Sequence, residues 1–222
     1  MTGGGSLRLG PGQRYGLLLG LIGASLTFQL AAPVSGWSRL VTVALQGVTL
    51  LLALWTSEVR PLLLRLAALA VAVGLVASLG ALLGDGDMGS DSTTVVNLLL
   101  VGVAPAAIVI GLVRRVRADR GVTLATMYGV LCVYLLAGMF FAFVYGAIDA
   151  FGSSGVFAER ADATQADFLY FSFTTLTTTG FGDLTADTGV GRAVAIGEAL
   201  LGQVYLVTVV AAIVTNLRPR HA

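Results

Sequence analysis

The sequence predicts an all-α membrane protein with six transmembrane helices, and three observations lead to this fold class. Hydrophobic residues make up 56% of the 222-residue chain, and charged residues make up only 11%. The mean hydropathy of +0.90 is far above that of soluble proteins. The apolar residues also gather into six runs of about the 20 residues that a helix needs to cross a bilayer. These runs cover residues 16–32, 40–57, 62–83, 94–113, 122–151 and 190–217.

The arginines predict the orientation of these spans. If both termini are cytoplasmic, ten of the 13 basic residues lie on the inner side and three on the outer side, as the positive-inside rule requires. The inner arginines are Arg8, Arg14, Arg60, Arg65, Arg114, Arg115, Arg117, Arg120, Arg218 and Arg220, and the outer ones are Arg39, Arg160 and Arg192. The chain contains arginine but no lysine, and it is rich in alanine and glycine. We therefore expect a multi-pass protein of a bacterial inner (plasma) membrane, in contact with its lipids.

The first span has a second interpretation. Arg14, the short apolar run and Leu30-Ala31-Ala32 are also typical of a secretory signal peptide with its cleavage site. Retaining this span leaves an even number of spans and both termini on one side. We therefore expect it to be retained, and the intact mass of the purified protein distinguishes the two interpretations.

The fourth span, 94–113, is where a voltage sensor of a six-span protein would carry its charges. Membrane voltage acts on a charge in its field with about 2.3 kcal/mol per 100 mV, so a sensor needs basic residues spread along the helix. The span contains no basic residue, and four arginines between 114 and 120 crowd at its cytoplasmic end. This cluster favours a patch for lipid headgroups. We predict a four-helix N-terminal domain, 1–120, without gating charges.

A short segment between the fifth and sixth spans carries the strongest functional signal. Residues 167–177 are too few to cross a bilayer, and Thr178-Thr179-Gly180-Phe181-Gly182-Asp183 follows them. Rings of backbone carbonyls can replace the hydration shell of a cation. Successive carbonyls point the same way only if the backbone alternates in handedness, which favours glycine at every second position. The spacing of Gly180 and Gly182 therefore predicts a cation site made of main-chain oxygens, with the Thr178 hydroxyl as a further oxygen at its inner end.

The stretch from Tyr170 to Leu184, YFSFTTLTTTGFGDL, resembles the pore helix and selectivity filter of the tetrameric potassium-channel superfamily. The resemblance implies a pore domain, 121–222, with an outer helix, a re-entrant pore helix, a filter and an inner helix. Because the chain has one filter motif, it implies a homotetramer. The implied filter residues are Thr178, Thr179, Gly180, Phe181 and Gly182, with K⁺ bound through residues 178–181. The permeant K⁺ ions are the only cofactor that the resemblance implies.

Five further residues are assigned supporting roles. The resemblance places Tyr170 as a hydrogen-bond donor to Asp183, and Thr174 at a site that is acidic in some relatives. Glu198 is the one carboxylate that we place within a transmembrane helix, where its burial is expensive. We expect it to brace the pore helix or filter from behind by hydrogen bonds, with a pH-sensing role as the alternative. Gly202 aligns with the family's mid-helix glycine, and two interpretations stay open, a gate hinge and close helix packing.

Two departures from the commonest family pattern leave the selectivity open. Thr179 replaces the usual Val or Ile, and its hydroxyl could recruit water behind the filter. Phe181 replaces a common Tyr, whose partner position is the equally apolar Phe171, so we expect ring packing there. The leading prediction is a potassium-selective channel without strong voltage gating. The alternatives are a weakly selective monovalent cation channel and a non-conducting regulatory subunit that retains the pore fold.

Other classes of function find no support in the residues. Cys132 is the sole cysteine, so no intrachain disulfide is possible, and His221 lies in the terminal tail. The sequence has no phosphate-binding loop and no catalytic triad, so we predict neither an enzyme nor a nucleic-acid partner. Acidic residues cluster in the predicted outer connections, either to concentrate cations or as ordinary solvated loops. They are Asp85, Asp87, Asp91, Asp149, Glu159, Asp162, Asp167 and Asp187.

Overall fold

A computed structural model describes residues 11–33, 35–56, 61–83, 123–152, 155–160 and 162–216 of the chain. The described residues form six α-helices. They are α1 (Pro11–Ala31), α2 (Gly36–Thr56), α3 (Pro61–Leu83), α5 (Leu124–Phe151), α6 (Gln165–Leu176) and α7 (Gly189–Asn216). An isolated antiparallel bridge pairs Phe157 with Ala186. The all-α class predicted from the composition is therefore confirmed for this part of the chain.

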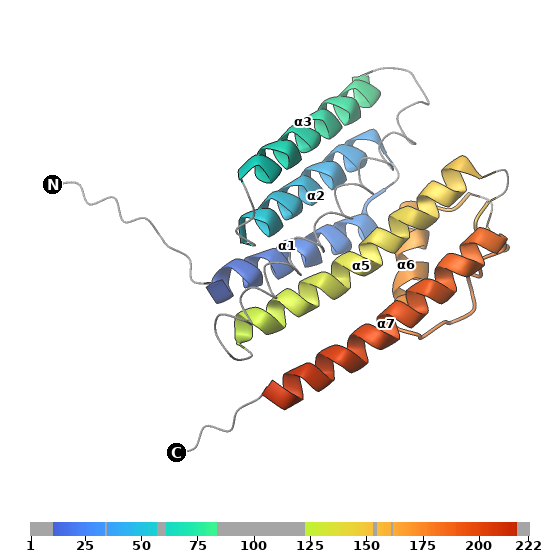
Figure 1. Ribbon diagram of the computed structural model, residues 1–222. Helices are drawn as coiled ribbons and strands as arrows, with labels where there is room; N and C mark the ends of the chain where they lie inside the picture. The colour runs from blue at the N-terminus through green and yellow to red at the C-terminus, as the bar shows by residue number, and fades with distance from the viewer. Residues whose placement is uncertain are drawn as a thin grey trace, which may run out of the picture.

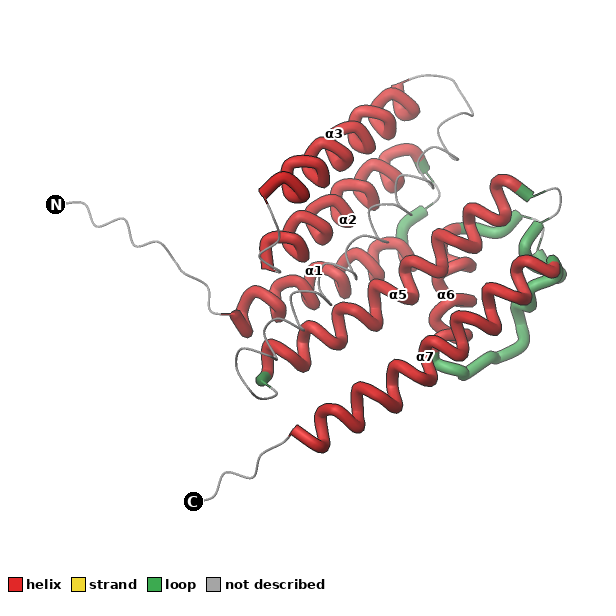
Figure 2. Tube along the Cα trace, viewed as in Figure 1, coloured by secondary structure: helices red, strands yellow, loops and turns green. Residues whose placement is uncertain are grey.

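The long helices lie side by side in the order α3, α2, α1, α5 and α7 (Figure 1). Helices α1 and α2, α2 and α3, and α5 and α7 run antiparallel, and α1 begins at the same end of the bundle where α7 ends. The short helix α6 lies between α5 and α7 near the opposite end, and it also contacts α1. Figure 2 shows the loop that leads from the end of α6 to the start of α7. Helix α1 therefore contacts both α6 and α5, the helix on which α6 packs.

The predicted spans agree closely with the observed helices. Four described helical segments are long and apolar enough to cross a membrane: Gly12–Ala31, Gly36–Thr56, Leu124–Phe151 and Gly189–Val209. In α3 the described apolar stretch is shorter, Ala67–Val76. The predicted fourth span, 94–113, and the arginines that follow it lie outside the described residues. The complete six-span layout stays a prediction.

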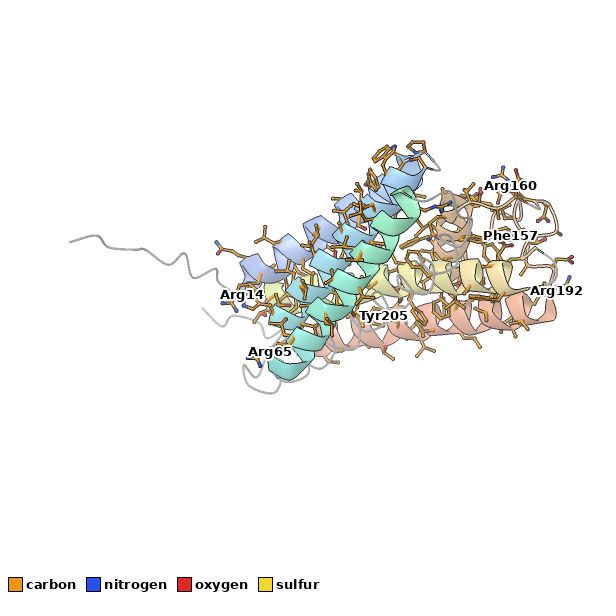
Figure 3. The ribbon with its side chains drawn as sticks, turned by 90° about the horizontal axis from the view of Figure 1, so that it is seen from above. Arg14, Arg65, Phe157, Arg160, Arg192 and Tyr205 are labelled. Carbon is orange, nitrogen blue, oxygen red and sulfur yellow. The ribbon has the colours of Figure 1, made fainter. Side chains whose placement is uncertain are left out.

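Aromatic and basic side chains mark the two ends of the bundle. Trp37 and Trp55 stand 18 positions apart on α2, about 27 Å along a helix that rises 1.5 Å per residue. That distance is close to the thickness of the hydrocarbon core, about 30 Å, at whose boundaries tryptophan is enriched. The Arg14 guanidinium lies 4.3 Å from the centre of the Trp55 ring. Figure 3 shows Arg14 and Arg65 at one end of the bundle, and Arg160 and Arg192 at the other.

The core runs through the contact between α1 and α5. Tyr15, Leu18 and Ile22 of α1 are almost completely buried, and the Tyr15 carbonyl oxygen lies 3.9 Å from the sulfur of Cys132 on α5. A Cβ on Gly16 would lie 3.7 Å from the Tyr128 ring, which is ordinary contact distance. Helix α1 thus packs along α5 through a continuous buried face, and this face positions the leading helices against the rest of the protein.

Candidate functional site

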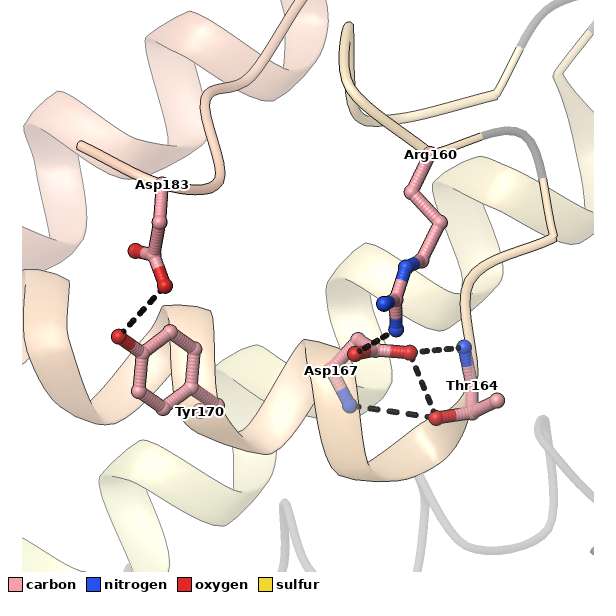
Figure 4. Close-up of polar contacts among 5 residues, drawn as sticks. All are labelled: Arg160, Thr164, Asp167, Tyr170 and Asp183. Carbon is pink, nitrogen blue, oxygen red and sulfur yellow. Dashed lines mark hydrogen bonds and ion pairs between the residues drawn. The ribbon is translucent and has the colours of Figure 1, made fainter. Parts of the chain in front are cut away.

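The start of α6 is fixed by a capping box, in which two residues satisfy each other's free backbone amides. The Thr164 hydroxyl accepts from the Asp167 amide at 3.4 Å, and the Asp167 carboxylate accepts from the Thr164 amide at 2.8 Å. Arg160 forms an ion pair with the same carboxylate at 2.5 Å (Figure 4). Burial raises the pKa of Asp167, but the hydrogen bonds from Arg160 and Thr164 outweigh this, and the pKa lies below its ordinary value. Helix α6 therefore starts at a defined place.

The segment after α6 has the alternating backbone that the sequence predicts. The φ angles of Thr178, Gly180 and Gly182 are +57°, +51° and +80°, and Thr178 is the one described non-glycine residue with a positive φ. Thr179 and Phe181 therefore have negative φ, so the sign changes at every residue from 178 to 182. A β-branched residue at positive φ is a strained outlier. Such strain, of about 1–3 kcal/mol, is typical of functional sites.

Hydrogen bonds to α6 set the direction of the peptide groups. The Thr178 amide donates to the Thr175 carbonyl at 2.9 Å. The Thr179 and Gly180 amides both donate to the Thr174 carbonyl, at 2.8 and 3.1 Å. The N–H and C=O of a trans peptide point in opposite directions. The carbonyls of Thr177, Thr178 and Thr179 are therefore turned away from α6, toward the exposed side of the chain.

The carbonyl groups of this segment face the exposed side of the chain, and this exposed side is the candidate site. All residues from 177 to 183 are exposed in the single chain, and the Phe181 side chain retains 68% of its accessible surface. A Cβ at Gly180 or Gly182 would meet nothing within 4 Å. Both glycines are therefore required by their positive φ and not by a steric contact within the chain.

Tyr170 and Asp183 come together as the resemblance implied. The Tyr170 hydroxyl donates to the Asp183 carboxylate at 2.8 Å (Figure 4). The Tyr170 ring also stacks on Phe181, with centroids 6.1 Å apart and planes 7° from parallel. One residue of α6 thus contacts the segment at two points near its C-terminal end.

Two details of the ring and hydroxyl packing were not foreseen. Within the single chain, the ring contacts of Phe171 are with Tyr145 and Phe157 and not with Phe181; both are edge contacts at 5.0 Å between centroids. The Thr179 hydroxyl lies 2.8 Å from the Thr177 hydroxyl, which also donates to the Phe173 carbonyl at 2.7 Å. The unusual hydroxyl of Thr179 therefore has a partner within the chain.

Thr174 contributes through its backbone more than through its side chain. Its carbonyl accepts two of the amides described above, while its hydroxyl donates to the Phe171 carbonyl at 2.9 Å. The residue type at this position is therefore less informative than its place in the last turn of α6.

Glu198 on α7 is fully buried, and its two oxygens contact two different helices. Oε2 lies 2.6 Å from the Tyr145 hydroxyl on α5, and Oε1 lies 2.5 Å from the Ser172 hydroxyl on α6. The sequence predicted that Glu198 braces the pore helix or filter from behind by hydrogen bonds. The contact to α6 is present, but the partners are Ser172 and Tyr145, neither of which the sequence singled out. A serine in the middle of a short apolar helix was the available signal.

Gly202 lies against the end of α6. A Cβ at this position would lie 2.1 Å from the Leu176 carbonyl oxygen, a distance that no side chain can adopt. Helix α7 continues without interruption from Gly189 to Asn216. Of the two interpretations left open for Gly202, close packing has direct geometric support. The Tyr134 hydroxyl donates to the same Leu176 carbonyl at 3.2 Å, so α5 and α7 both contact the last residue of α6.

The loop before α6 holds the segment that follows residue 183. The Ala158 amide donates to the Thr185 carbonyl at 3.2 Å, and the Asp187 amide donates to the Val156 carbonyl at 2.8 Å. The Glu159 carboxylate accepts from the Thr185 hydroxyl and amide, and these bonds hold its pKa below the ordinary value. Several acidic residues thus have structural partners, which favours ordinary roles over a purely electrostatic one. Asp85, Asp87 and Asp91 lie outside the described residues.

Comparison with known proteins points to the same part of the chain. Residues 129–218 match the protein-family model described as "Ion channel". The match covers most of α5, all of α6, the segment 177–188 and α7, and it supports an ion-channel domain there. It does not include α1, α2 or α3. A comparison with curated proteins finds no match.

Proposed function

We propose that the chain forms a homotetrameric, potassium-selective channel that conducts through the main-chain oxygens of residues 178–181. The observation that carries the proposal is the alternation of φ along this segment, with the amides of 178–180 bonded to α6. Because these amides are bonded to α6 of the same chain, the carbonyl groups of the same peptides form a column on the opposite side. Such a column is the kind of oxygen lining that replaces a cation's hydration shell.

A single chain has only one side of such a lining. Its carbonyl-bearing segment is exposed, and a cage around a bare cation needs oxygens from several directions. Helix α7 also exposes large apolar side chains, including Ile196, Leu200, Val204 and Val207, each about 60% or more exposed. Neighbouring copies and lipid would cover this surface. These features support a ring of four chains around a common axis, with Thr178 at the inner end of the oxygen column.

The selectivity for potassium rests on a filter that keeps its shape. The Thr179 hydroxyl, which raised the alternative of a leaky filter, is paired with Thr177. Tyr170 supports the outer end through Asp183 and Phe181. These contacts favour a potassium-selective channel over a weakly selective cation channel.

Flux measurements on the purified protein in liposomes test the proposal. We expect uptake of K⁺ and Rb⁺ and little uptake of Na⁺ by the full chain alone, and cross-linking that reaches a tetramer. Gly180→Ala is expected to abolish flux, because a Cβ at positive φ costs about 1–2 kcal/mol in each of four chains. Gly197→Ala is the matched control, since Gly197 lies on α7 with nothing within 4 Å and no positive φ.

The outcomes separate the alternatives. Equal uptake of K⁺ and Na⁺ would favour a weakly selective channel. A protein that assembles as a tetramer but gives no flux would favour the regulatory subunit. Cross-linking that stops at dimers would overturn the proposal that four chains share one column of carbonyl oxygens.

A further inference from the structure

Ser172 lies between two oxygen atoms, and its hydroxyl has one proton to donate. Its Oγ is 2.7 Å from the Gly138 carbonyl oxygen on α5 and 2.5 Å from Glu198 Oε1 on α7. A backbone carbonyl has no proton, so it can only accept. If Ser172 donates to Gly138, the proton between Ser172 and Glu198 must come from the carboxyl group.

The second oxygen of Glu198 is engaged in the opposite sense. The Tyr145 hydroxyl lies 2.6 Å from Oε2 and has no other described acceptor, so it donates to Glu198. One oxygen of the carboxyl group then accepts a hydrogen bond while the other donates one. This is the pattern of a carboxylic acid, whereas a carboxylate accepts at both oxygens.

The surroundings of Glu198 contain no described positive charge that would favour the ionised form. Helices α5 and α6 are the described elements that pack against α7. The groups that act on Glu198 are the phenols of Tyr145 and Tyr134 on α5 and the Ser172 hydroxyl on α6. Glu198 itself is 0% exposed in the single chain, so its burial does not depend on assembly. An unpaired charge at such a site is expensive.

We propose that Glu198 is a protonated, neutral acid at neutral pH and donates its proton to Ser172. Glu198, Ser172 and the Gly138 carbonyl then form a directional chain that ties α7 to α6 and α6 to α5. Glu198 and Ser172 are positioning residues: they hold α6, whose Thr174 carbonyl in turn anchors the amides of Thr179 and Gly180. The consequence for ion flux rests on the proposed function, whereas the protonation state does not.

Ionisation of Glu198 breaks this chain. When the carboxyl group loses its proton at alkaline pH, Glu198 can no longer donate to Ser172, and Ser172 cannot donate to two acceptors at once. The contact between α6 and either α5 or α7 is then lost. Support of the segment 178–182 is therefore present at neutral pH and lost as the pH rises.

Infrared spectroscopy of the purified protein tests the protonation state without any flux measurement. We expect the carbonyl stretch of a protonated carboxylic acid in the wild-type spectrum, sensitive to deuterium, and its absence in Glu198→Gln. Ser172→Ala should shift this band, because the acid loses its acceptor. Glu159→Gln is the matched control: it removes an exposed carboxyl group of the outer loop and should leave the band in place. A wild-type spectrum without the band would overturn the proposal.

Flux in liposomes tests the consequence. The glutamine amide offers one donor and one acceptor, as the neutral acid does, so Glu198→Gln should retain wild-type flux at neutral pH. We expect wild-type flux to fall severalfold as the pH rises, while Glu198→Gln stays flat. A loss of flux in Glu198→Gln while the wild type is indifferent to pH would show that the ionised form is the working one. If no variant conducts, the proposed function fails, and the infrared band still decides the protonation state.

Discussion

Helices α5–α7 and helices α1–α3 use their buried polar groups in different ways. In α5–α7 these groups bond from one helix to another, through Tyr145 to Glu198, Ser172 to Gly138, Tyr134 to Leu176 and Tyr205 to Val130. In α1–α3 they mostly bond within their own helix, through Thr49 to Leu45, Thr56 to Ala53, Ser78 to Gly74 and Gln29 to Ser25. The polar contact from α2 to α1, Gln46 Nε2 to Gln29 Oε1, is long at 3.4 Å.

Because of this difference, hydrogen bonds fix the relative positions of helices α5–α7, whereas helices α1–α3 are held together mainly by packing. A hydrogen bond between helices fixes their relative position, because it weakens steeply when distance or angle changes. Apolar contacts and bonds within one helix allow small shifts at little cost. Helices α5–α7 are therefore built to hold α6 and the segment after it in one geometry. Helices α1–α3 are joined to that unit by the apolar face of α1, and a change among them should reach the site only weakly.

Among the substitutions that compare the two regions, the largest effect is expected from Gly202→Ala. The new Cβ would lie 2.1 Å from the Leu176 carbonyl oxygen, so α7 and α6 must move apart. Overpacking of this kind costs about 1–3 kcal/mol, and here the opposing group is backbone. We expect a loss of K⁺ flux of roughly tenfold or more, since 1.4 kcal/mol corresponds to a factor of ten. We also expect reduced discrimination against Na⁺ in what flux remains.

Gly197→Ala on the same helix tests whether any alanine substitution in α7 lowers flux, or only one that disturbs the contact between Gly202 and Leu176. Gly197 is exposed, and a Cβ there meets nothing within 4 Å. This variant should conduct like the wild type. If Gly202→Ala instead keeps its ion selectivity and changes only the open probability, the hinge interpretation is correct and the packing one is wrong.

A matched pair of glycines compares the two regions directly. A Cβ at Gly138 on α5 would lie 2.8 Å from the Phe173 ring of α6, and a Cβ at Gly47 on α2 would lie 2.5 Å from Val71 of α3. Each alanine variant should lose about 1–2 kcal/mol of stability. We expect Gly138→Ala to lower flux severalfold and Gly47→Ala to lower the thermal midpoint while flux stays near normal. Equal losses of flux in both variants would contradict the division between positioning and packing.

The sequence predicted the helices and the alternating segment because both depend on local patterns. Apolar runs of bilayer length predict α1, α2, α3, α5 and α7 to within a few residues at most ends. Glycines two positions apart predict the backbone handedness at 180 and 182. The positive φ of Thr178 has no such local cause, because threonine disfavours it. It is held there by bonds to α6, which only the folded chain supplies.

The partners of Glu198 and Gly202 could not be predicted from the sequence for a related reason. Which residue of α6 faces α7 depends on the rotation and depth of a 12-residue helix packed between two longer ones. A shift of one residue would replace Ser172 by Phe171 or Phe173 as the partner of Glu198. The burial of a carboxylate in an apolar span indicated that polar partners exist. It did not indicate that they come from two different helices.

A smaller effect is expected from Tyr170→Phe. The variant loses the 2.8 Å hydrogen bond to Asp183 but keeps a ring that can stack on Phe181. One hydrogen bond contributes about 0.5–1.5 kcal/mol, and here it is exposed. We expect flux to persist at first and to decline faster during sustained conduction, as measured from the time course of Rb⁺ uptake. Asp183→Asn should behave alike, and the double variant should add nothing, because both remove the same bond.

The smallest effect is expected from Gln46→Leu. Gln46 is 2% exposed, its Nε2 makes only the long contact to Gln29, and its Oε1 is a buried acceptor without a described partner. Hydrogen bonds between membrane helices contribute about 0.6 kcal/mol on average, whereas an unpaired buried acceptor costs about 1–3 kcal/mol. Removing both should leave the thermal midpoint unchanged or raise it, with flux and selectivity like the wild type. Ser172→Ala, the same kind of polar deletion on α6, should lower flux under identical conditions. A clear loss of flux in Gln46→Leu would mean that the contact between α1 and α2 also positions the site, through the face that α1 shares with α5 and α6.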